Sequence, residues 1–334
     1  MRAIVFPSVH HFEVAEVAEP EGRAGWLTLQ VGAAGICGTD LHILDGEFPM
    51  AKFPCIPGHE FAGTVIRVGP DAGDFQPGDR VGVMPSVFCG TCHWCRNGRG
   101  NLCPNAGGFG TSLPGGFAER VAVLATHAYR LPDALSFAGA ALIEPLACAV
   151  HAFHRLNPRA GESYLIWGAG TMGLMLAQYA RFAGAGTVAL IDINRAKLDR
   201  ARTFGFEALG ESYADFRDRG PFGFDNVIEA TGVPAVVESA CEAVTPGGRL
   251  LLFGVCPPGA RASLEPYRIY RDEIDVIGSM AVFESYEPAL QAMVSGAIDG
   301  RRMVSHTFDL EGFGDALDVV RSGAGMKVQI VPAS

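Results

Sequence analysis

"SYLIWGAGTMGLMLAQYARFAGAGTVALIDIN", residues 163–194, reads in order as a strand, a glycine-rich turn, a helix and a second strand. The short apolar run at its start suits a strand that is buried on both faces of a parallel sheet. Gly168, Gly170 and Gly173 form G-x-G-x-x-G in the turn, and Asp192 ends the second strand, twenty-two residues after Gly170. A glycine motif in this context is typical of a dinucleotide-binding unit.

The residue types in this unit also indicate which dinucleotide it binds. Glycines let the backbone approach a pyrophosphate at the N-terminus of the helix, where free N–H groups favour anions. The Asp192 carboxylate would accept hydrogen bonds from the adenosine ribose and would repel a 2′-phosphate. The sequence therefore predicts NAD rather than NADP. A glycine turn that only packs a helix against a sheet, without a nucleotide, is the alternative.

The alternation of strands and helices continues beyond this unit. Further buried strands are expected at 224–232, 247–255 and 274–280, with helices near 195–204 and 234–244. This pattern predicts a doubly wound parallel sheet over residues 146–284. Residues 1–145 are instead rich in glycine, proline and short β-branched runs, which indicates a β-rich domain with many turns. The fold class is therefore α/β, with two domains.

Composition excludes several classes of protein. The 334 residues are 49% hydrophobic and 19% charged, as in ordinary globular domains. A net charge of −10 argues against a nucleic-acid binder, which needs a basic face. We find no signal peptide and no run that approaches the ~20 apolar residues of a membrane span. We therefore expect a cytoplasmic protein that binds neither nucleic acid nor a membrane.

Four of the nine cysteines are concentrated in residues 89–103, "CGTCHWCRNGRGNLC". An odd number of cysteines without an export signal makes a disulfide framework improbable. The four are Cys89, Cys92, Cys95 and Cys103, and their spacing predicts a tetrahedral structural zinc site. An iron–sulfur cluster and uncoordinated thiols are the alternatives. Four thiolates would leave no position for a substrate, so this site would stabilise a loop and would not catalyse.

A second set of metal-type residues lies upstream. "GICGTDLHILDG" supplies Cys37, and "IPGHEFAGTV" supplies His59 and Glu60. A catalytic zinc needs three protein ligands of these types and one open position. Each residue alone has a simpler explanation, because cysteine is often buried and "GHE" could be a polar turn. Together, upstream of a dinucleotide unit, they indicate a catalytic zinc.

These motifs occur together in one known family. "GICGTD", "GHEFAGTV", "GDRV", the cysteine quartet, "LIEPLACAVHA", "GAGTMG" and "EATG" follow one another in the family's order. The chain thus resembles a zinc-dependent medium-chain dehydrogenase/reductase, and is most similar to the sorbitol, polyol and threonine dehydrogenase branch. The resemblance implies a GroES-like catalytic domain, residues 1–145 completed by 285–334, and a Rossmann NAD domain, residues 146–284. It also implies a homodimer or homotetramer.

The resemblance assigns roles to individual residues. It implies two zinc ions per chain and transfer of a hydride between a secondary alcohol, such as a polyol or sugar alcohol, and NAD. Thr39 matches the hydroxyl that takes the substrate proton, and His42 matches the imidazole that passes it to solvent. Asp40 matches the carboxylate that fixes the tautomer of a ligand histidine. The third zinc ligand is either Glu60, which we favour, or Glu144 in "IEPLA". Further cofactor contacts are expected at Met172, Lys197, Gly254, Val255, Ser279 and Met280.

The sequence is also compatible with other functions. The alcohol could be threonine-like or a simple secondary alcohol, and "GSMAVFESY" lacks the arginine and tyrosine often found in sorbitol dehydrogenases. A binding protein that retained the fold and lost catalysis is a further alternative, although the catalytic residues are intact. Zinc-free quinone and enoyl reductases of the same superfamily lack both metal sets.

Overall fold

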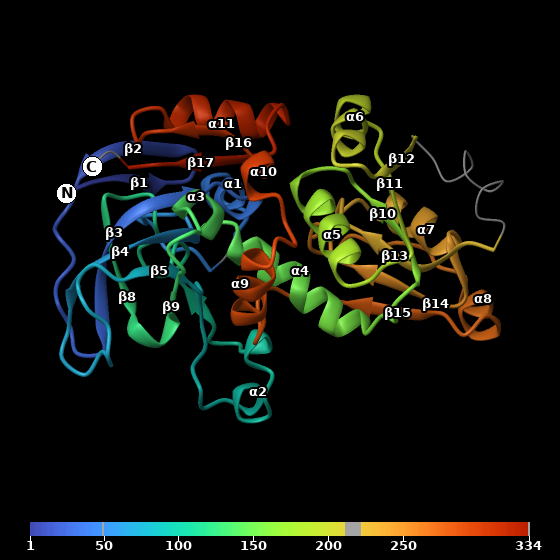
Figure 1. Ribbon diagram of the computed structural model, residues 1–334, viewed down its shortest axis with the longest axis horizontal. Helices are drawn as coiled ribbons and strands as arrows, with labels where there is room; N and C mark the ends of the chain where they lie inside the picture. The colour runs from blue at the N-terminus through green and yellow to red at the C-terminus, as the bar shows by residue number, and fades with distance from the viewer. Residues whose placement is uncertain (49, 211–221, 333–334) are drawn as a thin grey trace. The chain divides into compact units, whose positions relative to one another are not determined.

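The computed structural model describes residues 1–48, 50–210 and 222–332 (Figure 1). These residues form two compact units. Unit 1 comprises residues 1–147 and 282–334, and unit 2 comprises residues 148–281. The chain therefore leaves unit 1, builds unit 2 and returns to complete unit 1.

Unit 2 is built on a parallel sheet of six strands in the order β12-β11-β10-β13-β14-β15. The strands are β10 (Ser163–Trp167), β11 (Thr187–Ile191), β12 (Glu207–Gly210), β13 (Phe224–Glu229), β14 (Val244–Leu252) and β15 (Asp275–Gly278). The first strand, β10, lies in the interior of the sheet, and later strands are added on either side of it. This order is that of a doubly wound dinucleotide-binding fold, so the predicted Rossmann sheet is confirmed.

The helices of unit 2 follow its strands. They are α5 (Thr171–Phe182), α6 (Arg195–Thr203), α7 (Pro234–Glu242) and α8 (Pro266–Arg271). α5 packs on β10 and β11, and α7 packs on β13 and β14. Leu165, Val227 and Leu250 form one buried cluster on three neighbouring strands. The short α8 was not predicted; proline at its first position fits a helix start because its missing N–H would be unpaired there.

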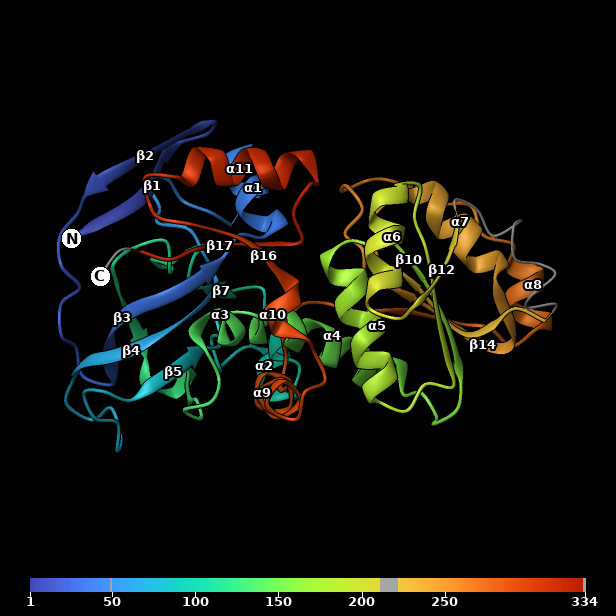
Figure 2. The ribbon, with the colours of Figure 1, turned by 45° about the horizontal axis from the view of Figure 1, so that its top comes forward.

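Unit 1 is built mainly on an antiparallel sheet, ordered β16-β17-β3-β4-β5-β9, with β8 paired to β3. The strands are β3 (Trp26–Gly35), β4 (Glu60–Val68), β5 (Arg80–Val83), β8 (Arg120–Leu124), β9 (Ala128–Arg130), β16 (Val304–Phe308) and β17 (Lys327–Ile330). Figure 2 shows β3, β4 and β5 side by side. The C-terminal β17 joins β3 antiparallel, with Gln329 opposite Gly35. Residues of β17 thus reach the end of β3.

Smaller elements complete unit 1. They are β1 (Arg2–Ser8), β2 (His11–Glu16), β6 (Ser86–Val87), β7 (Gly107–Gly108), α1 (Gly38–Leu44), α2 (His93–Arg96), α3 (Phe137–Ala140), α9 (Tyr286–Val294), α10 (Gly300–Met303) and α11 (Phe313–Ser322), with single 3-10 turns at Gly100–Leu102 and Ala125–His127. Phe313 of α11 packs against Phe6, Phe12 and Phe117, which fastens the C-terminal helix to the N-terminal hairpin.

One apolar helical segment departs from the expectation. Phe137–Leu156, which contains α3 and α4 (Ile143–Leu156), is long and apolar enough to cross a membrane by length and composition. However, 78% of its most apolar window is buried inside the protein. The sequence expectation that no such stretch exists was wrong. A helix that is apolar on most sides suits a protein core as well as a membrane, and the burial of this segment identifies it as a core helix.

Candidate metal centres and cofactor site

The cysteine quartet forms a closed set of four sulfur atoms. The Sγ atoms of Cys89, Cys92, Cys95 and Cys103 all lie within 4.8 Å of one another. The Cys89–Cys95, Cys92–Cys103 and Cys89–Cys103 sulfurs are 4.0, 3.8 and 3.5 Å apart. Thiolates at ~2.3 Å from a tetrahedral zinc would be about 3.8 Å apart. The four side chains therefore fit a zinc ion without a free position.

The local backbone supports this arrangement. The N–H of Cys92 points to the sulfur of Cys89, and the N–H of Cys95 to the sulfur of Cys92, each at 3.4 Å. N–H groups of Thr91 and Cys92 favour the thiolate of Cys89 and lower its pKa to about 5. These donors come from within the same loop, so this part of the site is built by consecutive residues.

Cys37, His59 and Glu60 form the second group, with their ligand atoms within 4.8 Å of one another. Cys37 lies between the end of β3 and the start of α1, and Glu60 is the first residue of β4. Because β3 and β4 are antiparallel neighbours, with Gly35 opposite Glu60, these chain positions meet at one end of the sheet. Side chains of all three predicted ligand types are thus brought together.

Asp40 lies beneath this group and is fully buried. Its Oδ2 accepts from the backbone N–H of Cys37 (2.8 Å), and its Oδ1 accepts from the N–H of Gly58 (3.1 Å). The carboxylate thereby ties the loop of Cys37 to the loop of His59. Its Oδ1 is 3.7 Å from His59 Nδ1, which is buried and has no hydrogen-bond partner among the described residues. Asp40 thus lies next to this imidazole, and its predicted role in fixing the tautomer of His59 stays a prediction.

The charge of His59 is controlled by its surroundings. Burial alone would lower the pKa of His59, but Asp40 and Cys37 together outweigh burial and raise this pKa well above its usual range. A metal ion binds only neutral imidazole. Zinc would therefore have to displace a proton from His59, and the donor set of thiolate, imidazole and carboxylate is one that zinc accepts.

Glu60 has a partner that the sequence analysis did not identify. Lys327, the first residue of β17, donates to both carboxylate oxygens of Glu60 at 2.7 and 2.6 Å and to the carbonyl oxygen of Ile36 at 3.1 Å. Glu60 is fully buried and Lys327 is 4% exposed. Gly35 makes room for the pair, because a Cβ there would overlap Oε2 of Glu60. A lone lysine in the apolar stretch "KVQIVP" was the available signal.

Glu144 lies on α4 and is nearly buried, at 9% exposure. It is not part of the close group that Cys37, His59 and Glu60 form among the described residues. It is near enough to Lys327 for its charge to help raise the pKa of that ammonium group. Of the two glutamates that the sequence left open, the structure brings Glu60 into the metal group and leaves Glu144 beside it.

The glycine turn of unit 2 has the geometry expected of a phosphate-binding loop. Gly170 is the N-cap of α5, and Gly168 has a positive φ of 101°. A Cβ on Gly173 would overlap the carbonyl oxygen of Gly168, so only glycine allows the helix to approach the turn. Asp192 lies beside this turn: its Oδ2 accepts from the N–H of Ala169 and its Oδ1 from the N–H of Asn194, both at 2.8 Å.

Comparison with known proteins agrees with both halves of this description. An alcohol dehydrogenase GroES-like domain model matches residues 23–133, and a zinc-binding dehydrogenase model matches residues 171–295. The chain belongs to the zinc-dependent alcohol dehydrogenase family. The predicted family, the GroES-like and Rossmann domains, the oxidoreductase class and the zinc and nicotinamide cofactors are thereby confirmed.

Two curated members of this family are similar over most of their length. D-altritol 5-dehydrogenase of Agrobacterium fabrum is 38% identical over 93% of each chain. D-arabinitol dehydrogenase 1 of Uromyces fabae is 35% identical over 99% of this chain and 97% of its own. Among solved structures, a zinc-binding dehydrogenase from Sinorhizobium meliloti 1021, bound to NADP, has a TM-score of 0.93 at 35% identity and covers 99% of each chain.

The two predicted relay residues lie on α1. The Thr39 hydroxyl is 4.0 Å from the sulfur of Cys37, and so lies next to the metal group. His42 is exposed, and its Nδ1 is 2.8 Å from Oε2 of Glu47. Glu47 was not identified from the sequence. It occupies one ring nitrogen of His42 and leaves Nε2 for another partner.

The other predicted cofactor residues lie at the carboxyl ends of the strands of unit 2 or just beyond them. Val255 follows β14 and is 86% exposed, and Ile193, which was not predicted, follows β11 and is 83% exposed. Exposed apolar side chains at this edge of a Rossmann sheet suit a ring of the cofactor. The remaining positions are Met172 and Lys197 near the starts of α5 and α6, and Ser279 and Met280 after β15.

Gly254 has a structural reason to be glycine. A Cβ there would overlap the backbone nitrogen of Gly232 and lie 2.7 Å from Oε2 of Glu229. Glu229 is fully buried at the end of β13; its Oε1 accepts from the N–H groups of Thr231 and Gly232, and its Oε2 has no partner among the described residues. Gly254 thus allows two loops at the cofactor edge to touch.

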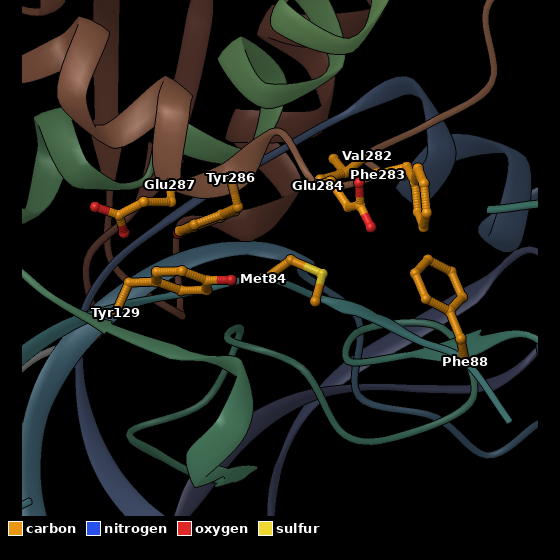
Figure 3. Close-up of a pocket in the computed structure, with 8 residues that line it drawn as sticks. All are labelled: Met84, Phe88, Tyr129, Val282, Phe283, Glu284, Tyr286 and Glu287. Carbon is orange, nitrogen blue, oxygen red and sulfur yellow. The ribbon is translucent and has the colours of Figure 1, made fainter. Parts of the chain in front are cut away.

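A separate hollow of 260 Å³ lies within unit 1 (Figure 3). It is lined by Met84, Phe88, Tyr129, Val282, Phe283, Glu284, Tyr286 and Glu287. The rings of Tyr129 and Tyr286 are 4.8 Å apart, and those of Phe88 and Phe283 are 6.2 Å apart. None of the predicted site residues lines this hollow.

Proposed function

We propose that this chain is an NAD-linked zinc dehydrogenase that oxidises a secondary hydroxyl group of a polyol or sugar alcohol to a ketone. The observation that carries this proposal is the convergence of Cys37, His59 and Glu60 at one end of the unit 1 sheet, in a chain whose other unit has a dinucleotide turn. The similarity to arabinitol and altritol dehydrogenases supports a polyol as substrate.

The protein side chains divide the chemistry between them. Cys37, His59 and Glu60 would hold the zinc, which supplies a Lewis acid that lowers the pKa of the substrate hydroxyl, while bound NAD supplies the hydride acceptor. Asp40 holds His59 in place. Thr39, beside Cys37, takes the hydroxyl proton, and His42 passes it to solvent through Nε2 while Glu47 holds Nδ1.

Asp192 is the basis for the choice of NAD. Two backbone N–H groups hold its carboxylate beside the glycine turn. A fixed negative charge there accepts hydrogen bonds from ribose hydroxyls and repels a 2′-phosphate. Since the similar Sinorhizobium structure contains NADP, the preference for NAD is a testable part of this proposal.

The remaining assignments follow the same reasoning. Cys89, Cys92, Cys95 and Cys103 would hold a second, structural zinc, and residues 1–145 with 285–334 would form the catalytic domain. None of the nine cysteines forms a disulfide, in keeping with the reducing cytoplasm that we propose for this protein. We expect a homodimer or homotetramer.

A substrate panel tests the proposal. Purified enzyme would be assayed with arabinitol, altritol, sorbitol, threonine and a simple secondary alcohol, each with NAD and with NADP, by following reduced nicotinamide absorbance. We expect a polyol with NAD to give the highest kcat/KM, and a zinc chelator to abolish turnover. Turnover that survives removal of all zinc, or a preference for NADP, would contradict the proposal.

A further inference from the structure

The proposed dehydrogenase chemistry gives no role to the ion pair between Lys327 and Glu60. A buried ammonium group loses its hydration, and it is tolerated only where carboxylates and carbonyl oxygens replace water. Lys327 meets this requirement with both oxygens of Glu60 and the carbonyl oxygen of Ile36. Burial would lower the pKa of Lys327, but the charges of Glu60, Cys37 and Glu144 together outweigh this effect and raise it.

A purely structural ion pair is the simplest interpretation. Its place in the fold argues for more, because the carboxylate that it engages is the third member of the metal group. Both oxygens of Glu60 are occupied by Lys327. Each carboxylate oxygen keeps a second lone pair, so a metal ion can share Glu60 with Lys327, but the ammonium charge then lies close to the metal and weakens its binding. Lys327 and a metal ion compete for the same carboxylate.

The charges around Lys327 also indicate that it affects metal binding. The thiolate of Cys37 and the carboxylates of Glu60 and Glu144 all act on Lys327. Three negative groups exceed the charge of one divalent cation by one unit. The positive charge of Lys327 offsets part of this negative charge, so a divalent cation that binds the group meets a weaker attraction.

We propose that Lys327 is a positioning residue that stands in for the metal as the counter-ion of Glu60 in the metal-free enzyme and thereby sets the metal affinity of the catalytic site. This inference rests on the proposed zinc site. The lysine gives the buried carboxylate of Glu60 a counter-ion when no metal is bound, and it weakens metal binding because the metal must compete with it for Glu60.

Replacement of the lysine tests the competition. Lys327→Met removes the charge and leaves an unbranched side chain that is one atom shorter, and Lys52→Met makes the same change at an exposed lysine as the control. Zinc would be titrated into stripped protein against a competing chelator, with the cysteine quartet as an internal reference. We expect Lys327→Met to bind catalytic zinc about tenfold more tightly or better, because a positive charge a few ångströms from the metal disappears. Lys327→Arg should stay close to wild type.

Thermal unfolding provides a second readout. Without zinc, Lys327→Met should melt below wild type, because Glu60 is buried without a counter-ion. The rise in Tm on adding zinc should then exceed that of wild type. If the stripped variant does not fold, the rate at which the loaded variant releases zinc to a chelator replaces this measurement, and slower release is expected.

A double-mutant cycle separates competition for Glu60 from plain repulsion between charges. In a Glu60→Gln background, Lys327→Met should change zinc affinity much less than it does in wild type. Unchanged or weaker zinc binding in Lys327→Met, or an equal loss of Tm with and without zinc, would overturn the inference and leave a structural ion pair. Binding of only one zinc by wild type would instead overturn the proposed catalytic site itself.

Discussion

The two metal-type groups of unit 1 differ in where their parts come from. The quartet is contained in fifteen consecutive residues, and its supporting N–H groups belong to the same loop. The Cys37 group combines the ends of β3 and β4 with Lys327 from β17, which is 267 residues from Glu60 in the chain. The first is closed and local, whereas the second is assembled by the fold and keeps Glu144 as a neighbour. Three protein ligands leave one position on a zinc ion for a substrate, and only the second group offers that.

His59→Ala tests whether the Cys37 group holds the catalytic zinc. Without the imidazole the metal loses one of three protein ligands, and with it the Lewis acid that stabilises charge in the transition state by several kcal/mol. We expect kcat/KM to fall by about 10³-fold or more. Elemental analysis should find one zinc per chain instead of two, with Tm close to that of wild type that retains only the zinc of the quartet. Retention of both zincs would show that His59 is not a ligand.

Cys92→Ser tests whether the cysteine quartet holds a structural zinc. Closing the loop of residues 89–103 on a metal contributes free energy to folding. We expect loss of one zinc and a fall in Tm of roughly 10 °C, since each kcal/mol is worth a few degrees in a chain of this size. Any remaining folded enzyme should retain the catalytic zinc and turnover. A variant with unchanged Tm and two zincs would contradict the structural assignment.

Asp192→Ala tests the cofactor site of unit 2. There, the backbone N–H groups of Ala169 and Asn194 donate to the carboxylate of Asp192. Loss of a charged hydrogen-bond acceptor should raise KM for NAD about ten- to a hundredfold. KM for NADP should change little or fall, because the repulsion of the 2′-phosphate disappears as well. Steady-state kinetics with both cofactors would measure this, and equal changes in the two KM values would contradict the role of Asp192.

Glu47→Gln tests whether Glu47 orients His42 of the proposed proton relay. The contact of Glu47 with His42 is open to solvent, and exposed pairs of this kind contribute little. We expect turnover to fall by about fivefold at most, with the shape of the pH profile of alcohol oxidation changed. Glu16→Gln, another exposed carboxylate of unit 1, is the control. Identical profiles for Glu47→Gln and wild type would mean that Glu47 does not orient the relay.

The comparison also explains what the sequence could reveal. Local patterns contained the quartet and the glycine turn with Asp192, because each of these motifs needs only nearby residues. The catalytic group was inferred from two local fragments, Cys37 and His59–Glu60, which meet only through the pairing of β3 with β4. Lys327 could not be placed, since its contact with Glu60 depends on the pairing of β17 with β3. Glu47 was missed because its contact with His42 depends on the path of the loop after α1.

Two further features required the fold. Gly254 was predicted as a cofactor residue from resemblance alone, whereas its close approach to Gly232 depends on how the loops after β13 and β14 pack. The apolar segment Phe137–Leu156 has the composition of a membrane span, and only its burial identifies it as a core helix.

Stepwise removal of zinc from wild-type enzyme tests the central claim most directly, namely that one group catalyses and the other maintains the fold. Increasing chelator would be added while zinc content, turnover and circular dichroism are followed on the same samples. We predict that loss of the first zinc abolishes turnover and leaves the circular dichroism spectrum unchanged, and that loss of the second unfolds the loop of the quartet and lowers Tm. Turnover that persists at one zinc per chain and disappears only when the second zinc and Tm are lost would contradict the account.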